Sequence, residues 1–465
     1  MDTIANGSLF LMLGDTALSV LNLTIREKQG AHGRMSVTAA AESEVKEYLL
    51  YEEKGNAALY AFSRGSLKPV FFGTITMMQI KNMGKHCVVC LEVATTSYLM
   101  DITPRNRCFQ DTDMTSHELA KRILEPYGQI SRALLFIPNE KLGQIMVQYQ
   151  ETDWEFLNRL LSKYGTGACC DSSAAGISLR AGLGDDMEDV NWDYLPYVAG
   201  RDTALRARNG ELKKQLFYQV QSHEVFSLGT KLQFRGHELY IGKIQRTLRQ
   251  GLLASTYDLY FKEGMQVSRY YNSFLNGVSI NGRVTGIERN RVQVGLESDA
   301  LTEYKRQYFY PFSTIAASAD GSGWYCMPQK GDPVRIFFPT DNESEGYAIA
   351  NIYAEFSPSV DSPINNPDVK DITAPDGKSV KFVSGGIQLS VGERYGTVTL
   401  TNDGLVAIKT QEDIEITAED AVYLTTEGTM KIFAGREIQI TNDAGGSICM
   451  TEDTVEIQAS IIGSN

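Results

Sequence analysis

The 465-residue chain lacks several features that mark common functional classes. It has no run of 18 apolar residues, so we expect no membrane-spanning helix. Its first residues lack a basic stretch followed by an apolar core, so we expect no signal peptide. Its seven cysteines are odd in number and scattered, which favours reduced thiols in a cytosolic compartment. We expect such a protein to leave its cell within a larger machine or by lysis.

The chain also has fewer basic than acidic residues: it contains 44 Lys and Arg and 57 Asp and Glu, for a net charge of −13. An acidic chain is repelled by phosphate backbones and by anionic membrane surfaces. Binding of single-stranded nucleic acid would need stacking aromatics in a basic groove. Residues 275–356 do carry cations that could line such a groove, among them Arg283, Arg289, Arg291 and Lys305. Since the chain around them is acidic, we expect no nucleic-acid partner.

Motifs for nucleophilic catalysis are missing, because no serine or cysteine stands in a context such as G-x-S-x-G. Cys87 and Cys90 have the C-x-x-C spacing. A zinc or redox site would need a second pair or a helix N-terminus, and the valines between these two favour a strand. Cys169 and Cys170 are adjacent in another expected strand. We interpret all four as structural thiols.

Polar side chains crowd two expected helix starts, namely Asp113, His117, Glu151, Asp153 and Glu155. The helix dipole favours anions at such positions. A glycosidase pair would in addition need a sugar cleft. Capping therefore explains these residues, and we expect no catalytic, cofactor-binding or metal-binding residue and no cofactor.

The composition favours a mainly β fold. Glycine outnumbers proline by 41 to 13, and threonine and tyrosine are frequent, a mix typical of strands joined by tight turns. The length suits three or four domains. Short alternating strands occur in residues 1–100 and again in 201–270, where they predict a second small barrel. About five short strands in residues 275–356 predict an OB-like barrel.

Residues 101–200 differ from their surroundings because they predict two capped helices. Thr115-Ser-His-Glu118 and Thr152-Asp-Trp-Glu155 are capping boxes, in which the hydroxyl accepts from the N3 amide and the glutamate reaches back to the cap. Apolar residues follow each box at helical spacing, and Gly128 and Gly165 end the helices. This segment is therefore expected to be an α/β insertion.

A repeat fills residues 372–465, after a polar linker at 357–371 that has three prolines in fifteen residues. Apolar residues two apart recur at a constant step of eight, five times in succession, with turn formers between them. The strict pairs are Val398/Leu400, Val406/Ile408, Ile414/Ile416, Val422/Leu424, Met430/Ile432 and Ile438/Ile440, and looser copies include Ile448/Met450 and Val455/Ile457. Each unit predicts one short strand, buried on one face, and one turn.

Eight residues are too few for a coil of a single-chain β-helix, which needs about twenty. They suit one side of a triangular prism in which three chains each supply one strand per face per layer. Interleaved chains would pair every strand edge. The six strict pairs, with Ile448, Val455 and Ile457, would then line the trimer axis. The alternative is an ordinary meander or sandwich of short hairpins, whose loops usually vary in length.

Three segments resemble the VgrG and phage baseplate hub–spike proteins of contractile injection systems. Residues 148–160, Q-Y-Q-E-T-D-W-E-F-L-N-R-L, are similar to the family's Q-Y-x-E-[ST]-D-x-x-F-L-x-R-L segment. Residues 323–334, G-W-Y-C-M-P-Q-K-G-D-P-V, resemble its OB-domain signature, and the repeat resembles its needle. The resemblance implies a first hub β-barrel at 1–100, an α/β insertion at 101–200, a second hub β-barrel at 201–270, an OB-fold at 275–356 and a triple-stranded β-helical spike at 372–465, formed in a homotrimer.

The function that this resemblance implies is structural, with no enzymatic activity. The chain would be the hub and membrane-puncturing spike at the tip of a contractile injection machine. Its partners would be a tail-tube protein above the hub, baseplate wedge proteins and, transiently, the target membrane. It would be assembled in the bacterial cytoplasm and delivered outside the cell within the injection particle.

Departures from the family refine this expectation. The short linker leaves no room for the lysozyme domain of some phage spikes, and no effector domain follows Asn465. No histidine follows His237, so the chain cannot build a His-x-His iron tip. A separate PAAR-type tip protein and effectors are therefore expected, at the blunt end formed by Ile461 and Ile462. The alternatives are a cell-wall hydrolase, which would need a catalytic domain, and a β-helical receptor-binding fibre, which would not need the capped helices.

Overall fold

The computed structural model describes residues 4–42, 55–63, 66–128, 132–206, 212–296, 308–315, 325–350, 366, 368–374 and 376–463. The chain divides into two compact units, Met1–Ile352 and Tyr353–Asn465. Among the residues expected to carry the OB-domain signature, Gly323 and Trp324 lie outside the described residues. So do Lys305 and most of the linker at 357–371.

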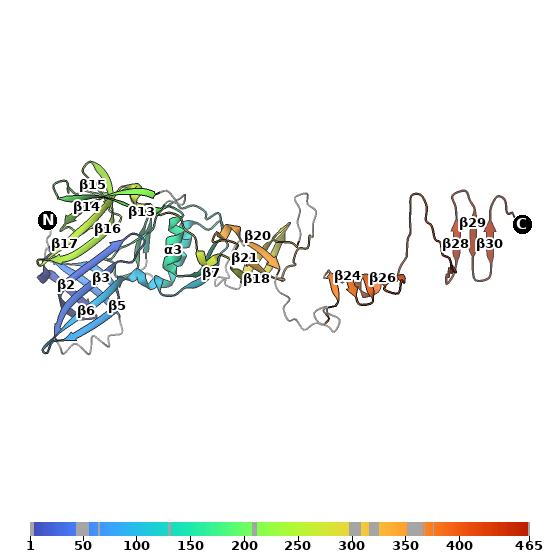
Figure 1. Ribbon diagram of the computed structural model, residues 1–465, viewed down its shortest axis with the longest axis horizontal. Helices are drawn as coiled ribbons and strands as arrows, with labels where there is room; N and C mark the ends of the chain where they lie inside the picture. Colours follow the sequence, from blue (N-terminus) through green and yellow to red (C-terminus); the bar gives the residue numbers. More distant parts are fainter. Residues whose placement is uncertain are drawn as a thin grey trace. The chain divides into compact units, whose positions relative to one another are not determined.

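A closed six-stranded barrel begins the first unit (Figure 1, blue). Its strands are β1 (Leu9–Leu13), β2 (Thr16–Lys28), β3 (Arg34–Glu42), β4 (Asn56–Ser63), β5 (Ser66–Asn82) and β6 (His86–Thr95), preceded by η1 (Asn6–Ser8). They follow the order β1-β4-β5-β6-β3-β2, and the pairing of β1 with β2 closes the ring. Alternate residues point inward, so Leu9, Leu11 and Leu13 lie in the core while Phe10 and Met12 lie outside.

The α/β insertion follows the barrel. Its elements are η3 (Thr96–Asp101), β7 (Arg105–Phe109), α2 (Ser116–Leu124), η4 (Glu125–Tyr127), β8 (Arg132–Leu135), β9 (Met146–Glu151), α3 (Asp153–Ser162), β10 (Ala168–Cys170) and β11 (Ser178–Ala181). Both capping boxes are confirmed: the Thr115 hydroxyl accepts from the Glu118 amide at 3.2 Å, and Thr152 accepts from Glu155 at 3.2 Å. In the described part of the chain, no helix is long and apolar enough to cross a membrane.

The second part of the hub joins the first barrel in one continuous sheet of twelve strands. Its strands are β12 (Met187–Glu188), β13 (Tyr197–Arg206), β14 (Leu212–Ser222), β15 (Lys231–Phe234), β16 (His237–Arg249) and β17 (Leu252–Tyr260), followed by η5 (Lys262–Met265) and η6 (Ser273–Leu275). β16 pairs with β17 along one edge, and with β15 and then β2 along the other. The sequence predicts a second small barrel in residues 201–270, and the structure joins its strands to those of the first barrel through the pairing of β16 with β2.

Buried ion pairs tie these parts together. Across the β2–β16 seam, Arg246 bonds Glu27, and both side chains are 3% exposed. Arg159 on α3 bonds both oxygens of Glu151, at 2.9 and 3.0 Å. It also bonds Glu343 of η7 (Glu343–Glu345), which belongs to the next domain. Because all these charges are buried, each depends on its partner.

A five-stranded antiparallel sheet completes the first unit, in the order β20-β19-β18-β21-β22. The strands are β18 (Ser279–Glu288), β19 (Arg291–Leu296), β20 (Phe309–Pro311), β21 (Pro333–Phe337) and β22 (Tyr347–Ala350). A tight turn at Arg289 and Asn290 joins the first two strands, and Arg289 takes a left-handed φ of 53° there. Its core includes Val292, Tyr310 and Phe338.

The C-terminal unit contains two antiparallel sheets (Figure 1, orange to red). The first has β23 (Lys370–Thr373), β24 (Lys378–Val383), β25 (Gly386–Val391), β26 (Gly396–Thr401) and β27 (Val406–Thr410), with the short α4 (Gly392–Tyr395). The second has β28 (Ile438–Thr441), β29 (Ser447–Met450) and β30 (Val455–Gln458). The repeat predicts strands that pair between chains. In these two sheets, consecutive strands of the same chain pair with each other instead, because the next strand offers the nearest free edge.

Candidate assembly surfaces

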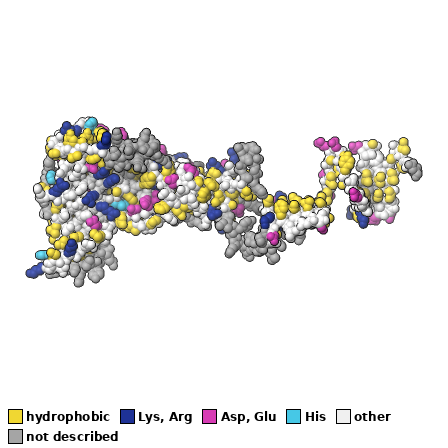
Figure 2. Space-filling model, in the orientation of Figure 1, with side chains coloured by type: hydrophobic (Ala, Val, Ile, Leu, Met, Phe, Trp, Pro, Cys, Tyr) yellow, Lys and Arg dark blue, Asp and Glu magenta, His cyan; other side chains and the backbone are white. Residues whose placement is uncertain are grey.

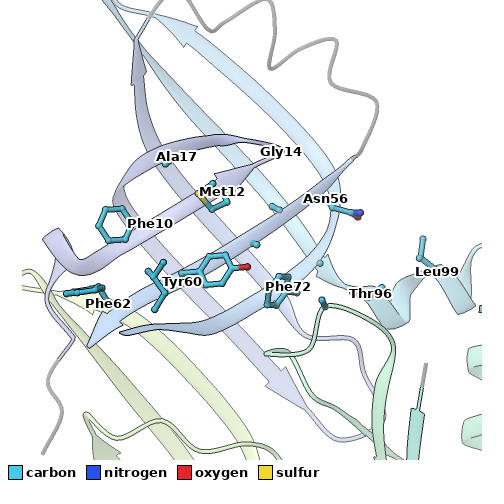
Figure 3. Close-up of a pocket in the computed structure, with 15 residues that line it drawn as sticks. Phe10, Met12, Gly14, Ala17, Asn56, Tyr60, Phe62, Phe72, Thr96 and Leu99 are labelled. Carbon is cyan, nitrogen blue, oxygen red and sulfur yellow. The ribbon is translucent and has the colours of Figure 1, made fainter. Parts of the chain in front are cut away.

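An apolar groove lies on the outer face of the first barrel, over β1, β4 and β5 (Figure 3). We call it the hub groove, and its volume is about 1030 Å³. Its lining consists of Phe10, Met12, Gly14, Ala17, Asn56, Ala57, Ala58, Tyr60, Phe62, Leu67, Phe72, Gly73, Thr96, Leu99 and Ala175. Tyr60 is the only titratable side chain among them, so the groove offers no acid–base pair for catalysis.

The register of the strands places the aromatic rings of the hub groove. Phe10 on β1 lies directly opposite Tyr60 on β4. A β-bulge in β5 turns two successive residues, Val70 and Phe71, into the core and leaves Phe72 facing outward. The Phe72 ring then meets Tyr60 edge-on, with ring centroids 5.5 Å apart. Exposed apolar surface of this extent on a folded barrel is typical of a protein-interaction site.

The sequence predicted the strand around Tyr60 but missed the hub groove. The available signal was that β1 and β4 are apolar on both faces, because Phe10, Tyr60 and Phe62 alternate with core leucines and alanines. A strand with one face in water is expected to be polar on that face. Phe62, which is 49% exposed, departs from this expectation.

Nine of the predicted axis residues lie in in-register rows on the two C-terminal sheets. Leu389, Val398 and Ile408 lie opposite one another in one row, and Ile387, Leu400 and Val406 in a second. In the other sheet the rows are Ile440, Ile448 and Ile457, and Ile438, Met450 and Val455. Ile414 continues the first row, along a groove of about 670 Å³. We call all these positions, with the pairs of residues 416–432, the apolar rows.

Among the described residues, the apolar rows are at most partly covered, since Val398, Ile438 and Ile448 are half-buried and most other members are exposed. The middle pairs of the repeat lie in no strand; they include Ile416, Val422, Leu424, Met430 and Ile432. The Leu424 side chain is 68% exposed. The two residues expected to bind a tip protein, Ile461 and Ile462, are likewise exposed. Figure 2 shows the apolar side chains (yellow) along the surface of both C-terminal sheets.

Residues 411–437, between the two sheets, keep the period of the repeat. Bends occur at 411–412, 419–420, 427–428 and 435–436, which are eight residues apart. Over this described stretch the backbone makes no hydrogen bond to other backbone. Backbone N–H and C=O groups in folded proteins are almost always paired, so this stretch has unused bonding capacity over three successive units.

The four thiols interpreted as structural, those of Cys87, Cys90, Cys169 and Cys170, are buried or half-buried. Cys87 is buried in the barrel core, and Cys90 lies on the same strand, β6. Burial raises the pKa of the Cys169 thiol to about 12 and that of Cys170 to about 11. Both are therefore held as neutral thiols. Within the described residues, no three His, Cys, Asp or Glu side chains are grouped to hold a metal.

The polar residues at the helix starts are bound by structural partners. Asp113 accepts from Lys141 at 2.9 Å, and the His117 ring contacts the Ile137 carbonyl at 3.0 Å. Asp153, fully buried, bonds Arg107, and Tyr127 donates to it at 2.7 Å. Glu155 completes a capping box, and Glu151 pairs with Arg159. The structure does not bring these side chains together around a cleft.

Comparison with known proteins adds to this geometry. Residues 36–209 match the family model of the phage tail baseplate hub (GPD). A search of curated proteins finds no match.

Solved structures share the fold. The E. coli c3393 protein, described as a type VI secretion component with structural similarity to the T4 bacteriophage tail proteins gp27 and gp5, has a TM-score of 0.54 at 15% identity, over 73% of this chain and 98% of its own. A chain of the half-lidded Francisella PdpA–VgrG complex has a TM-score of 0.57 at 9% identity, over 88% of each chain. A chain of the lidless PdpA–VgrG complex has a TM-score of 0.56 at 10% identity, over 88% of this chain and 98% of its own.

The family model and the solved structures agree on the kind of fold that this chain resembles. Residues 36–209, which are similar to the phage tail baseplate hub, hold part of the first barrel and the α/β insertion. The resemblance to VgrG and baseplate hub proteins, expected from the sequence motifs, is confirmed.

Proposed function

We propose that three copies of this chain form the hub and spike at the tip of a contractile injection machine. The hub parts, residues 1–270, form a ring, the sheet domain of residues 275–356 is an OB-fold collar, and residues 372–465 form an intertwined triple-stranded β-helix that punctures the target membrane. The observation that carries this proposal is the stretch 411–437, whose units repeat every eight residues without a backbone partner among the residues that the structure describes. Strands of two further copies would supply those partners.

The energetics favour such an assembly. Burying one exposed Val, Leu or Ile side chain stabilises by roughly 1.5–3 kcal/mol. The proposed axis holds fifteen side chains per chain: Val398, Leu400, Val406, Ile408, Ile414, Ile416, Val422, Leu424, Met430, Ile432, Ile438, Ile440, Ile448, Val455 and Ile457. The in-register rows support this because stacking three chains in the same register would bring like residues together on the axis.

The hub groove extends the proposal to the ring. Ring closure places a neighbouring copy against the outer face of each barrel, and the groove is an apolar surface that such a copy could cover. Val198 on β13 and Leu216 on β14, which are 61% and 55% exposed, offer apolar surface on the other side of the hub. A heterologous contact of this kind closes into a ring when its rotation allows.

Partners beyond the trimer follow from the same role. A tail-tube protein would sit above the hub, and wedge proteins of the baseplate would surround it. A separate PAAR-type tip protein would cap Ile461 and Ile462, and effectors would travel with it. The chain would be assembled in the bacterial cytoplasm and delivered outside the cell in the particle.

Two measurements on the full-length chain test this proposal together. Light scattering on a size-exclusion column should give a molar mass of three chains. Hydrogen exchange should then show slow amides across residues 411–437, because the inter-chain ladder protects them. A single-chain mass would contradict the trimer. A three-chain mass with fast exchange at 411–437 would contradict the intertwined spike while leaving the hub ring in place.

A further inference from the structure

A basic pocket lies on the surface where the two parts of the hub meet at the β2–β16 seam. We call it the seam pocket, and its volume is about 400 Å³. Two cross-strand rows build it. One runs through Arg34, Arg26, Gln245 and Thr256, and the other through Lys28, Lys243, Asp258 and Gln219. Figure 2 shows Lys and Arg side chains (dark blue) gathered over this part of the hub.

The rows set like charges directly against one another. Arg26 lies opposite Arg34, and Lys28 lies opposite Lys243. Like charges at directly opposed strand positions destabilise a sheet. Asp258, 3.9 Å from Lys243, is the one carboxylate in the two rows. Among the described residues, no ion pair joins Arg26 or Lys28 to an acidic side chain, so the pocket keeps a clear excess of positive charge.

Rigid neighbours hold the pocket in shape. His32, whose side chain is only 6% exposed, forms part of its wall and contacts Ser97 at 2.9 Å and Asp101 at 3.3 Å. The Arg34 guanidinium lies over the Tyr98 ring, 5.1 Å from its centroid. Below the seam the buried Glu27–Arg246 pair crosses from strand to strand. The cations are therefore presented on a framework that does not have to be ordered when a ligand arrives.

The chemistry of the lining favours carboxylates as the ligand. The amides of Gln219 and Gln245 and the hydroxyl of Thr256 stand beside the cations, a mixture suited to acidic side chains together with a peptide backbone. A nucleic acid strand would need open aromatic faces on which bases stack. The rings near the pocket are already engaged, because His32 lies against Trp154 with centroids 4.2 Å apart and edge-on to Tyr98.

We propose that the seam pocket is a docking site for an acidic segment of a partner protein, whose Asp or Glu side chains pair with Arg26, Lys28 and Arg34. The site is complete within one chain, so it does not depend on the proposed trimer. Its four cations give a partner both attraction at a distance and a fixed orientation once bound.

Fluorescence anisotropy of a labelled hexaglutamate peptide, titrated with the full-length chain, tests this site. We expect binding at low salt that weakens as salt is added. The double variant Arg26→Gln/Lys28→Gln should weaken binding about tenfold, since it removes two charge-assisted contacts. Asp258→Asn should strengthen it about threefold, because it removes the opposing carboxylate. The control Lys121→Gln/Arg122→Gln makes the same charge change on the exposed face of α2 and should leave binding unchanged.

Each alternative occupant has its own outcome. Equal loss of binding in the seam variant and the α2 control would show a general charge effect and overturn the site. Tighter binding of a labelled oligothymidylate than of hexaglutamate, lost in the seam variant, would assign the pocket to nucleic acid instead. A change of molar mass in the seam variant would mean that a second copy of this chain occupies it. Unchanged melting of the first unit in all variants shows that they fold.

Discussion

The two units of this chain treat their apolar side chains in opposite ways. Within the described residues, every buried hydrophobic side chain, from Ile4 to Ala348, belongs to the first unit. The second unit has comparable apolar residues in regular rows, and they are exposed or only partly covered. A unit that closes its own core is stable alone, whereas one that does not needs further copies to bury its surface. The predictions below test this difference, from the largest expected effect to the smallest.

Ile414→Asp should abolish the trimer. Three carboxylates would meet on the proposed axis, and an unpaired buried charge costs several kcal/mol even after relaxation. Light scattering should then report a single chain. The control Thr417→Asp adds the same charge at an outward position of the same unit and should keep the trimer. If Ile414→Asp forms a trimer of unchanged melting temperature, the axis is wrongly placed.

Arg159→Met should destabilise the first unit by about 3–5 kcal/mol, because Glu151 and Glu343 would remain buried without their partner. Burial already raises the pKa of the Glu151 carboxyl, which shows how far its charge depends on Arg159. Thermal unfolding followed by tryptophan fluorescence measures the loss.

Adding Glu151→Gln and Glu343→Gln to Arg159→Met should recover part of this stability, since no charge is then left unpaired. Arg122→Met, at an exposed site on α2, is the matched control and should change little. Equal effects of the two arginine variants would show that the buried network does not hold the domains together. The second unit, whose described residues contain no such network, should be unaffected in either case.

Phe62→Gln should separate folding from assembly at the hub groove. The side chain is 49% exposed, so the stability of an isolated chain should change by no more than about 0.5 kcal/mol. In the trimer the same change should lower the first unfolding transition by a few degrees, since a covered apolar contact is lost. Leu134→Gln, at a 53% exposed position on β8, is the control. Identical shifts in the trimer and in the monomeric Ile414→Asp background would contradict a ring contact here.

His32 should give the first unit a mild acid sensitivity. Burial lowers the pKa of its imidazole below the ordinary 6.5, against a hydrogen bond to Asp101 that raises it. The unfolded chain then binds a proton more readily than the folded one, so stability should fall as the pH drops through 6.5. Unfolding in urea at a series of pH values should show this slope, and His32→Gln should reduce it. A slope unchanged in His32→Gln would assign it to other groups.

Much of the fold could be predicted from local sequence patterns. The capping boxes at Thr115 and Thr152 could be predicted because all their bonds join residues three apart. The apolar rows could be predicted as a pattern because the period of eight is written in the sequence. The pattern shows which positions are apolar. It does not show which surface buries them, because that surface would belong to other copies of the chain.

Contacts between distant residues could not be predicted in this way. Arg159 and Glu343 are 184 residues apart, and no local rule links an arginine in a helix to that glutamate. The seam pocket depends on the pairing of β2 with β16, which combines cations from two distant segments. The hub groove depends on which face of β4 and β5 turns outward, which a bulge at Val70 decides.

The pairing of β2 with β16 also constrains the order in which this protein folds. Glu27 and Arg246 are 219 residues apart, so on the ribosome Glu27 has no partner until more than half of the chain has been made. The first barrel can close its own ring earlier, but its β2 edge must stay in water for that whole interval. The completion of the hub sheet is thus a late event set by chain length, and any C-terminal repeat that follows emerges only after the hub can be finished.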